Sequence, residues 1–172
     1  MPVEAPNYNP AQELVIIVDA ENNATGTATR AQMRAQGLIY RASYVLVFNK
    51  TGELFIQKRT ASKDIYPSHY DVAAGGVVLA GESYEESAAR ELHEELGIDN
   101  VELSFLFDHY HADADNKVWG RVFSCVYEGP MILQQEEIDF GVYIAPKKVL
   151  TMSRSEPFTP DGIDILHRFL KK

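Results

Sequence analysis

The stretch from residue 76 to 98, GVVLAGESYEESAARELHEELGI, constrains the fold of this 172-residue chain more than any other. Ser83 and Glu86 have the spacing of a capping box, in which each side chain accepts a hydrogen bond from the other residue's backbone N–H. Gly97 ends the pattern, because glycine readily adopts the left-handed conformation that closes a helix. The stretch therefore predicts a helix over residues 84–96.

Three carboxylates crowd the last two turns of this predicted helix. Glu91, Glu94 and Glu95 repel one another and lie at the end where the helix dipole disfavours anions. They border an apolar face made of Ala88, Ala89, Leu92 and Leu96. Helix stability does not explain this arrangement, whereas a divalent cation such as Mg²⁺ does, since hard cations take oxygen ligands. The alternative is a solvated acidic face.

The spacing of the whole stretch resembles the Nudix box at each fixed position. Those positions are Gly76, Glu82, Arg90, Glu91, Leu92, Glu94, Glu95, Gly97 and Ile98. A chance match at a given start is on the order of one in 10⁹ from average residue frequencies. The chain is therefore identified as resembling the Nudix hydrolases. This resemblance implies an α/β fold, an α/β/α sandwich around a mixed sheet.

The same resemblance implies an enzyme that hydrolyses a pyrophosphate linkage in a nucleoside diphosphate joined to a further group X. Glu91, Glu94 and Glu95, with the backbone carbonyl of Gly75, would bind one or more Mg²⁺ or Mn²⁺ ions. Arg90 would pair with a ligating carboxylate and hold its rotamer. A pyrophosphate is shielded from nucleophiles by its charged oxygens, so its hydrolysis needs cations and a base.

A second acidic cluster, residues 134–139 (QQEEID), precedes a predicted strand. In proteins of the Nudix type a carboxylate from this loop often faces the box, which favours Glu137, with Glu136 as the second choice. The attacking water would be deprotonated by Glu91 or by Glu137. A solvated loop glutamate is the open alternative.

Cationic side chains are needed to meet the substrate phosphates. Lys58 and Arg59 end a predicted strand, with Lys63 nearby, and would bind phosphate through charge-assisted hydrogen bonds. Ordinary surface charge is the alternative for these residues.

A closer resemblance links the segments around residues 40–42, 58–59 and 71–76 to the branch of Nudix proteins that includes isopentenyl diphosphate isomerase. That enzyme uses a cysteine before the box and a metal held by histidines. Here Ala74 stands at the cysteine position, and Tyr40 and Gly76 stand at the histidine positions. Hydrolysis is therefore favoured. An isomerase-like enzyme and a non-catalytic module that binds a nucleotide for regulation stay as alternatives.

The segment after residue 107 carries His109, His111, Asp113 and Asp115. Because their spacing matches no zinc pattern, we expect a loop that faces the substrate rather than a metal site.

The length and the 45% hydrophobic content fit one globular unit. We expect residues 1–39 to form an N-terminal strand-helix extension on a Nudix domain of residues 40–172. The expected strands cover residues 14–19, 44–48, 54–58, 71–74, 101–107, 118–127 and 141–145, and the 44–48 and 54–58 strands are expected to pair as a hairpin. Further helices are expected at residues 29–36 and 145–150 and from residue 159 onward. A turn is expected around Asn22, Asn23 and Gly26.

The formal net charge of −9 argues against a nucleic-acid partner, which normally requires a basic surface. With one cysteine, Cys125, no disulfide forms within the chain. The sequence shows no signal peptide and no apolar run long enough to span a membrane, so we expect a cytoplasmic protein without a membrane partner. A homodimer is the commonest closed assembly and stays open.

Overall fold

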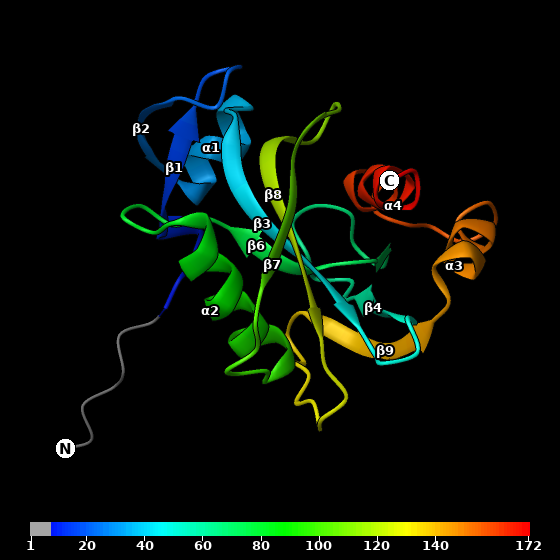
Figure 1. Ribbon diagram of the computed structural model, residues 1–172. Coiled ribbons are helices and arrows are strands. Elements are labelled where there is room, and N and C mark those ends of the chain that lie inside the picture. Colours follow the sequence, from blue (N-terminus) through cyan, green and yellow to red (C-terminus); the bar gives the residue numbers. More distant parts are fainter. Residues whose placement is uncertain (1–7) are drawn as a thin grey trace.

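The computed structural model describes residues 8–172 (Figure 1). The helices are η1 (Pro10–Gln12), α1 (Arg30–Gln36), α2 (Tyr84–Leu96), α3 (Pro146–Met152) and α4 (Pro160–Leu170). The strands are β1 (Leu14–Val18), β2 (Ala24–Thr29), β3 (Tyr40–Phe48), β4 (Leu54–Arg59), β5 (Tyr70–Asp71), β6 (Ala74–Val77), β7 (Ser104–Ala112), β8 (Lys117–Val126) and β9 (Ile138–Ile144). None of the described helices is long and apolar enough to cross a membrane.

The sheet is mixed, and β3 is its central strand. β3 runs parallel to β8 from the pair Tyr40↔Val118 to the pair Phe48↔Val126. It also pairs antiparallel with β6, whose residues 74–77 lie opposite residues 42–45. β7 pairs with β8, and β9 pairs with β4. The predicted α/β class with a mixed sheet is therefore confirmed.

Helices cover both faces of this sheet, with α2 on one side and α3 and α4 on the other (Figure 1). The side chains of β3 alternate between two cores, as the period of a strand requires. Leu46 packs in the core that contains Ile165 and Leu166 of α4. Val45 packs in the core that contains Leu92 of α2. The result is the expected α/β/α sandwich.

Helix α2 begins and ends where the sequence predicts. The Ser83 hydroxyl accepts a hydrogen bond from the Glu86 backbone N–H at 3.1 Å, which is one half of the predicted capping box. Gly97 closes the helix in the left-handed region at φ 65°, and its N–H reaches the carbonyls of Leu92 and His93. Ala88 and Leu92 are buried, whereas Ala89, predicted on the apolar face, is exposed.

The predicted 44–48/54–58 hairpin is wrong except at its tip. Phe48 pairs with Leu54, but the remainder of β3 takes β8 and β6 as its neighbours. The predicted 71–74 strand is wrong as a single strand, since Asp71 ends β5, Ala74 begins β6, and residues 72 and 73 connect the two. In both places the partners come from distant parts of the chain, and local turn signals do not reveal them.

The predicted loop that carries the two histidines is mostly strand. β7 extends to Ala112, which pairs with Lys117, so His109 and His111 lie within a long hairpin. Only residues 113–116 form its turn.

The N-terminal segment adds a second hairpin to the sheet. β1 pairs with β2 from Leu14↔Thr29 to Val18↔Ala24 and joins β3 at Ile17↔Tyr40. The turn covers residues 19–23, while Gly26, which we expected in the turn, lies in β2. Helix α1 follows directly, because Thr29 and Gln32 form a complete capping box.

Candidate active site

A cavity of about 520 Å³ lies between α1, β3, β6, α2 and the first turn of α4. Its lining includes all five residues that the sequence predicts as metal ligands or as the base, namely Gly75, Glu91, Glu94, Glu95 and Glu137. Arg59 and Arg90 also line it, whereas Lys58 does not. The fold therefore brings Gly75, Arg90, Glu137 and the three glutamates of α2 to one place.

Glu91 and Glu95 lie on successive turns of α2, and both line the cavity. Glu95 is only 7% exposed. Burial raises the pKa of Glu95 well above its ordinary value, and the neighbouring charge of Glu91 raises it further. Burial also raises the pKa of Glu91, although Arg90 opposes this. Glu91 has one cation at contact distance, Arg90, whereas Glu95 has no Lys, Arg or His side chain within 4.0 Å among the described residues.

Arg90 holds the acidic end of α2 in place. Its Nε and Nη2 atoms donate to the two Glu82 oxygens at 2.7 and 3.0 Å, and its Nη1 atom donates to Glu91 at 2.9 Å and to Glu94 at 3.2 Å. A further bond reaches the Val77 carbonyl at 3.2 Å. The hydrogen bonds with Glu82 are the largest cause that raises the pKa of Arg90, so this cation is permanent. It ties the loop before the helix to the carboxylates.

The two glycines of β6 allow the backbone to approach these groups closely. Gly75 has φ +144°, and a Cβ there would lie 1.9 Å from the Ser43 carbonyl oxygen. A Cβ on Gly76 would lie 2.6 Å from a carboxylate oxygen of Glu91. Any larger residue at either position would displace β3 or Glu91.

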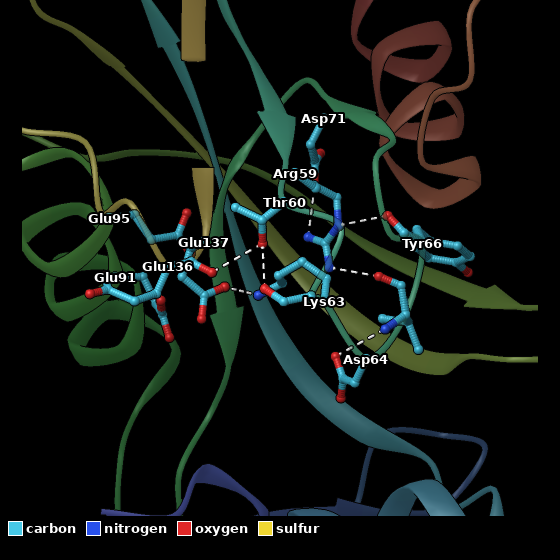
Figure 2. Close-up of polar contacts among 12 residues, drawn as sticks. Arg59, Thr60, Lys63, Asp64, Tyr66, Asp71, Glu91, Glu95, Glu136 and Glu137 are labelled. Carbon is cyan, nitrogen blue, oxygen red and sulfur yellow. Dashed lines mark hydrogen bonds and ion pairs between the residues drawn. The ribbon is translucent and has the colours of Figure 1, made fainter. Parts of the chain in front are cut away.

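Glu137 enters the cavity from the turn before β9, where Lys63 forms an ion pair with it (Figure 2). Thr60 fixes this arrangement, because its N–H donates to the Glu137 carbonyl at 3.1 Å and its hydroxyl donates to the Glu136 carbonyl at 3.0 Å. Burial, together with the charge of Arg59, lowers the pKa of Lys63 to about 8. The loop from residue 60 to 69 and the Glu137 turn thus form one polar unit.

Lys58 and Arg59 occupy different places, as consecutive residues of a strand must. The Arg59 guanidinium donates to the carbonyls of Ile65 at 2.9 Å and Tyr66 at 3.3 Å, and it lies 3.7 Å from Asp71 (Figure 2). The Lys58 ammonium lies 4.3 Å from the centre of the Tyr70 ring. Arg59 therefore shapes the 60–69 loop, and Lys58 packs outside the cavity.

Sequence reasoning did not find two cations of the cavity. Arg30 and Arg34 lie four residues apart on α1 and approach Asp64 at 3.6 and 3.0 Å. Their i,i+4 spacing predicts a shared helix face, but the cavity that this face borders is formed by residues far away in the sequence. Tyr44 and Asp161 line the cavity as well, and no local motif marks them.

The predicted substrate-facing group of His109, His111, Asp113 and Asp115, on β7 and the turn after it, does not line this cavity. His111 bridges Asp113 at 2.9 Å and Asp164 at 3.2 Å, and the Tyr66 hydroxyl donates to Asp113. Neither His109 nor His111 lines the cavity. Both carboxylate partners hold His111 within the hairpin and against α4, which accounts for this cluster without a ligand.

Residues 39–169 match the family described as the NUDIX domain. The chain belongs to the Nudix hydrolase family. An uncharacterized Nudix hydrolase of Pseudomonas aeruginosa, PA4841, is 44% identical over 92% of this chain and 94% of its own length. Another, YfcD of Escherichia coli K12, is 41% identical over 93% of this chain and 88% of its own length.

Solved structures show the same fold. DR0079 from Deinococcus radiodurans has a TM-score of 0.81 at 24% identity, covering 91% of this Nudix hydrolase and 98% of that chain. A MutT protein from Methanosarcina mazei Go1 has a TM-score of 0.68 at 24% identity, covering 77% and 94%. These likenesses concern the fold alone, and the relatives above carry no named substrate.

Nudix hydrolases generally use divalent cations, and the α2 carboxylates fit such an ion chemically. Glu95 is a buried acid with no cation within 4.0 Å among residues 8–172, and Glu91 shares Arg90 with Glu82 and Glu94. A hard cation prefers such oxygen ligands. Across residues 8–172, however, no three His, Cys, Asp or Glu side chains converge as a preformed metal site. Arg90 holds Glu94, and Lys63 holds Glu137. A third carboxylate would therefore have to leave its basic partner for the ion.

Proposed function

We propose that this Nudix hydrolase cleaves the pyrophosphate linkage of a nucleoside diphosphate joined to a group X, with Mg²⁺ as the cofactor and Mn²⁺ as a substitute. One observation carries the proposal. Two neighbouring carboxylates with raised pKa values, Glu91 and the buried Glu95, lie in a cavity that Lys63, Arg30 and Arg34 also line. A phosphate-bearing substrate with a divalent cation supplies the charge that each side lacks.

Glu91, Glu94 and Glu95, with the Gly75 carbonyl, would hold the ion. When bound, such a cation neutralises phosphate charge and increases the acidity of water. Arg90 would keep Glu91 and Glu94 oriented through the bonds it already makes with them. These four side chains come from one helix, so their relative positions are fixed before the substrate arrives.

The phosphate contact that the sequence assigns to Lys58 and Arg59 is better placed on Lys63. Arg59 already donates to two loop carbonyls, and Lys58 lies outside the cavity. The Lys63 ammonium lines the cavity, and its ion pair is with Glu137. A phosphate that attracts Lys63 would release Glu137, which could then accept a proton from the attacking water. Substrate binding would thus free the candidate base.

The isomerase alternative has less support. The chain's single cysteine, Cys125, lies buried on β8, where burial raises the pKa of its thiol to about 11. It is not among the residues that line the cavity. A thiol that is neutral and remote cannot transfer protons there. Failure of hydrolysis in the experiment below would instead favour the non-catalytic alternative, a module that binds a nucleotide for regulation.

The substrate is expected to be a small phosphate-bearing molecule. The charge of −9 disfavours nucleic acids as partners. A cytoplasmic location, the absence of a membrane partner and a homodimer stay predictions from the sequence.

A panel of nucleoside diphosphate derivatives tests the proposal. The products, which are phosphate monoesters, are converted to free phosphate by an added phosphomonoesterase and quantified. We expect hydrolysis with Mg²⁺ or Mn²⁺, and none with excess chelator. Glu94→Gln should lose most of the turnover without loss of fold, since the Glu94 side chain is 46% exposed. Turnover that persists in chelator, or full activity of E94Q, would contradict the proposal.

A further inference from the structure

Asp161 places a second kind of carboxylate in the same cavity. It lies in the first turn of α4, is 7% exposed and lines the cavity. The Tyr44 hydroxyl donates to its Oδ2 atom at 2.6 Å. Burial, followed by the charge of Asp161, raises the pKa of Tyr44, so the tyrosine stays a donor. The two residues are 117 positions apart, and only the tertiary fold joins them.

Asp161 has fewer partners than its burial demands. Within residues 8–172, Tyr44 is the one hydrogen-bond donor to its side chain, and no Lys, Arg or His side chain lies within 4.0 Å of it. The neighbouring Asp71 instead has Arg59 at 3.7 Å, the Ala73 N–H at 3.2 Å and the Thr159 hydroxyl at 3.3 Å. A buried carboxylate is stable only when donors surround it. Asp161 therefore has acceptor capacity left for a ligand.

Tyr44 also links Asp161 to the proposed metal edge. Its backbone lies opposite Gly75 in the β3–β6 ladder. Its ring packs against Gly120, where an added Cβ would lie 2.4 Å from the Tyr44 Cε2 atom. The ring thus has a fixed position between Gly120 of β8 and the first turn of α4.

We propose that Asp161, oriented by Tyr44, accepts a hydrogen bond from a hydroxyl of group X and selects substrates whose X is a sugar or ribose rather than additional phosphate. The inference rests on the proposed function, since X is defined by the pyrophosphate that the enzyme cleaves. An anion repels phosphate, and a neutral hydroxyl donor satisfies it without a second cation. Arg59 beside Asp71 already supplies positive charge at this end of the cavity.

A purely structural role is the competing explanation. An acid in the first turn favours a helix, and the bond to Tyr44 fastens α4 to β3. In that case Asp161→Asn and Tyr44→Phe would lower stability but change the turnover of all substrates equally. Asp164→Asn is the matched control, because Asp164 lies on the same helix, is 55% exposed and does not line the cavity.

The experiment compares ADP-ribose, a hydroxyl-bearing probe, with ATP, a phosphate-rich probe, both with Mg²⁺. We expect the wild type to prefer ADP-ribose. D161N should lose about 10- to 100-fold in kcat/KM for ADP-ribose, mostly through KM, as expected for a hydrogen bond to a charged group. Its kcat/KM for ATP should change by less than about threefold or rise. Y44F should show a smaller shift in the same direction, and D164N should match the wild type on both probes.

Equal losses on both probes, or a wild type that prefers ATP, would overturn the inference while leaving metal-dependent hydrolysis intact. If the wild type hydrolyses neither probe, the panel described above decides the proposed function. Calorimetric binding of ADP-ribose to the wild type and to D161N then decides the inference. Weaker binding to D161N supports it, and equal or undetectable binding overturns it.

Discussion

The cavity contains two pairs of acids with different surroundings, and one acid of each pair, Glu95 and Asp161, is buried. Glu91 and Glu95 on α2 have each other as neighbours, and Arg90 contacts Glu91 at 2.9 Å. Asp71 and Asp161, near the first turn of α4, have neutral donors and Arg59. Figure 2 shows Glu91, Glu95 and Asp71 together with Lys63 and Arg59. The first pair has a single cation within 4.0 Å among the described residues, Arg90, which Glu82 and Glu94 also contact. In the second pair, Asp161 lacks only a further hydrogen-bond donor.

This difference in partners distinguishes the carboxylates proposed to bind the metal from the carboxylate proposed to select the substrate. A pair of like charges in a buried place favours a divalent cation, which both carboxylates can contact. A carboxylate that already has a tyrosine donor gains little from such an ion and more from a hydroxyl. Both pairs are acids in one cavity, so their partners rather than their residue types assign their roles.

The largest expected effect comes from Glu95→Gln. Loss of a carboxylate from the α2 pair should lower kcat by about 10²- to 10³-fold, the scale for removal of a preorganised electrostatic group. Because Glu95 is buried beside Glu91, the neutral amide should leave the chelator-treated protein at least as stable as the wild type at pH 8. Activity assays and thermal unfolding measure both. An unchanged kcat in E95Q would show that the α2 pair has no special role in catalysis, and the proposed difference between the two pairs would be wrong.

Arg90→Lys keeps the positive charge but removes the planar group that donates to Glu82, Glu91 and Glu94. We expect a loss of about 10- to 100-fold in kcat/KM, the scale for residues that orient metal ligands. Titration of the Mg²⁺ requirement should also show weaker apparent affinity. A variant within twofold of the wild type in both measurements would show that the α2 carboxylates need no such support.

Lys63→Met should raise KM by about 10-fold, because one charge-assisted hydrogen bond to phosphate contributes about 1.5 kcal/mol. Lys58→Met is the matched control, since its ammonium lies over the Tyr70 ring and outside the cavity. Steady-state kinetics on the best substrate of the panel measure the difference. Equal effects of the two variants would remove Lys63 from the phosphate site.

The smallest effect concerns stability against pH. Burial raises the pKa of Asp71 to about 6, against the opposing charge of Arg59. The native protein therefore binds more protons than the unfolded chain between about pH 4 and pH 6. Its free energy of unfolding should fall as pH rises through this window and level off above about pH 6. The Asp71 contribution is about 1–3 kcal/mol.

Asp71→Asn should flatten this part of the profile. Urea unfolding of both proteins in chelator, at several pH values from 4 to 7, measures the slope. Parallel profiles for the wild type and D71N would show that Asp71 does not titrate in this window. The pKa of Asp71 would then not be raised in the way that the pKa values of Glu91 and Glu95 are, and the two pairs would differ in this respect too.

The helix that carries the carboxylates could be predicted from the sequence because its signals are local. Ser83 caps its first turn and Gly97 closes its last, and both act within a few residues. The partners of β3 could not be predicted in this way. Its neighbour β8 is separated from it by about seventy residues and by α2, so the turn at residues 49–52 suggested a hairpin that the fold does not extend.

The residues of the candidate site differ in the same way, because some could be predicted from a local motif and others only from the fold. Glu91, Glu94 and Glu95 follow from one motif, whereas Arg34, Tyr44 and Asp161 meet the cavity from three separate elements. Lys58 and Arg59 illustrate the limit of sequence proximity, since successive strand residues point to opposite faces. The charge pattern predicted that cations were needed, and the fold determined which ones line the cavity.

Binding of Mn²⁺ to the metal-free protein, measured by titration calorimetry, tests the central claim most directly. We expect saturable binding to the wild type and to D161N. Binding to E95Q should be weaker by about 10- to 100-fold, the scale that changes near a metal ligand set produce. If E95Q bound Mn²⁺ as well as the wild type does, or if D161N lost affinity as much as E95Q, the assignment of the metal to the α2 carboxylates would be wrong.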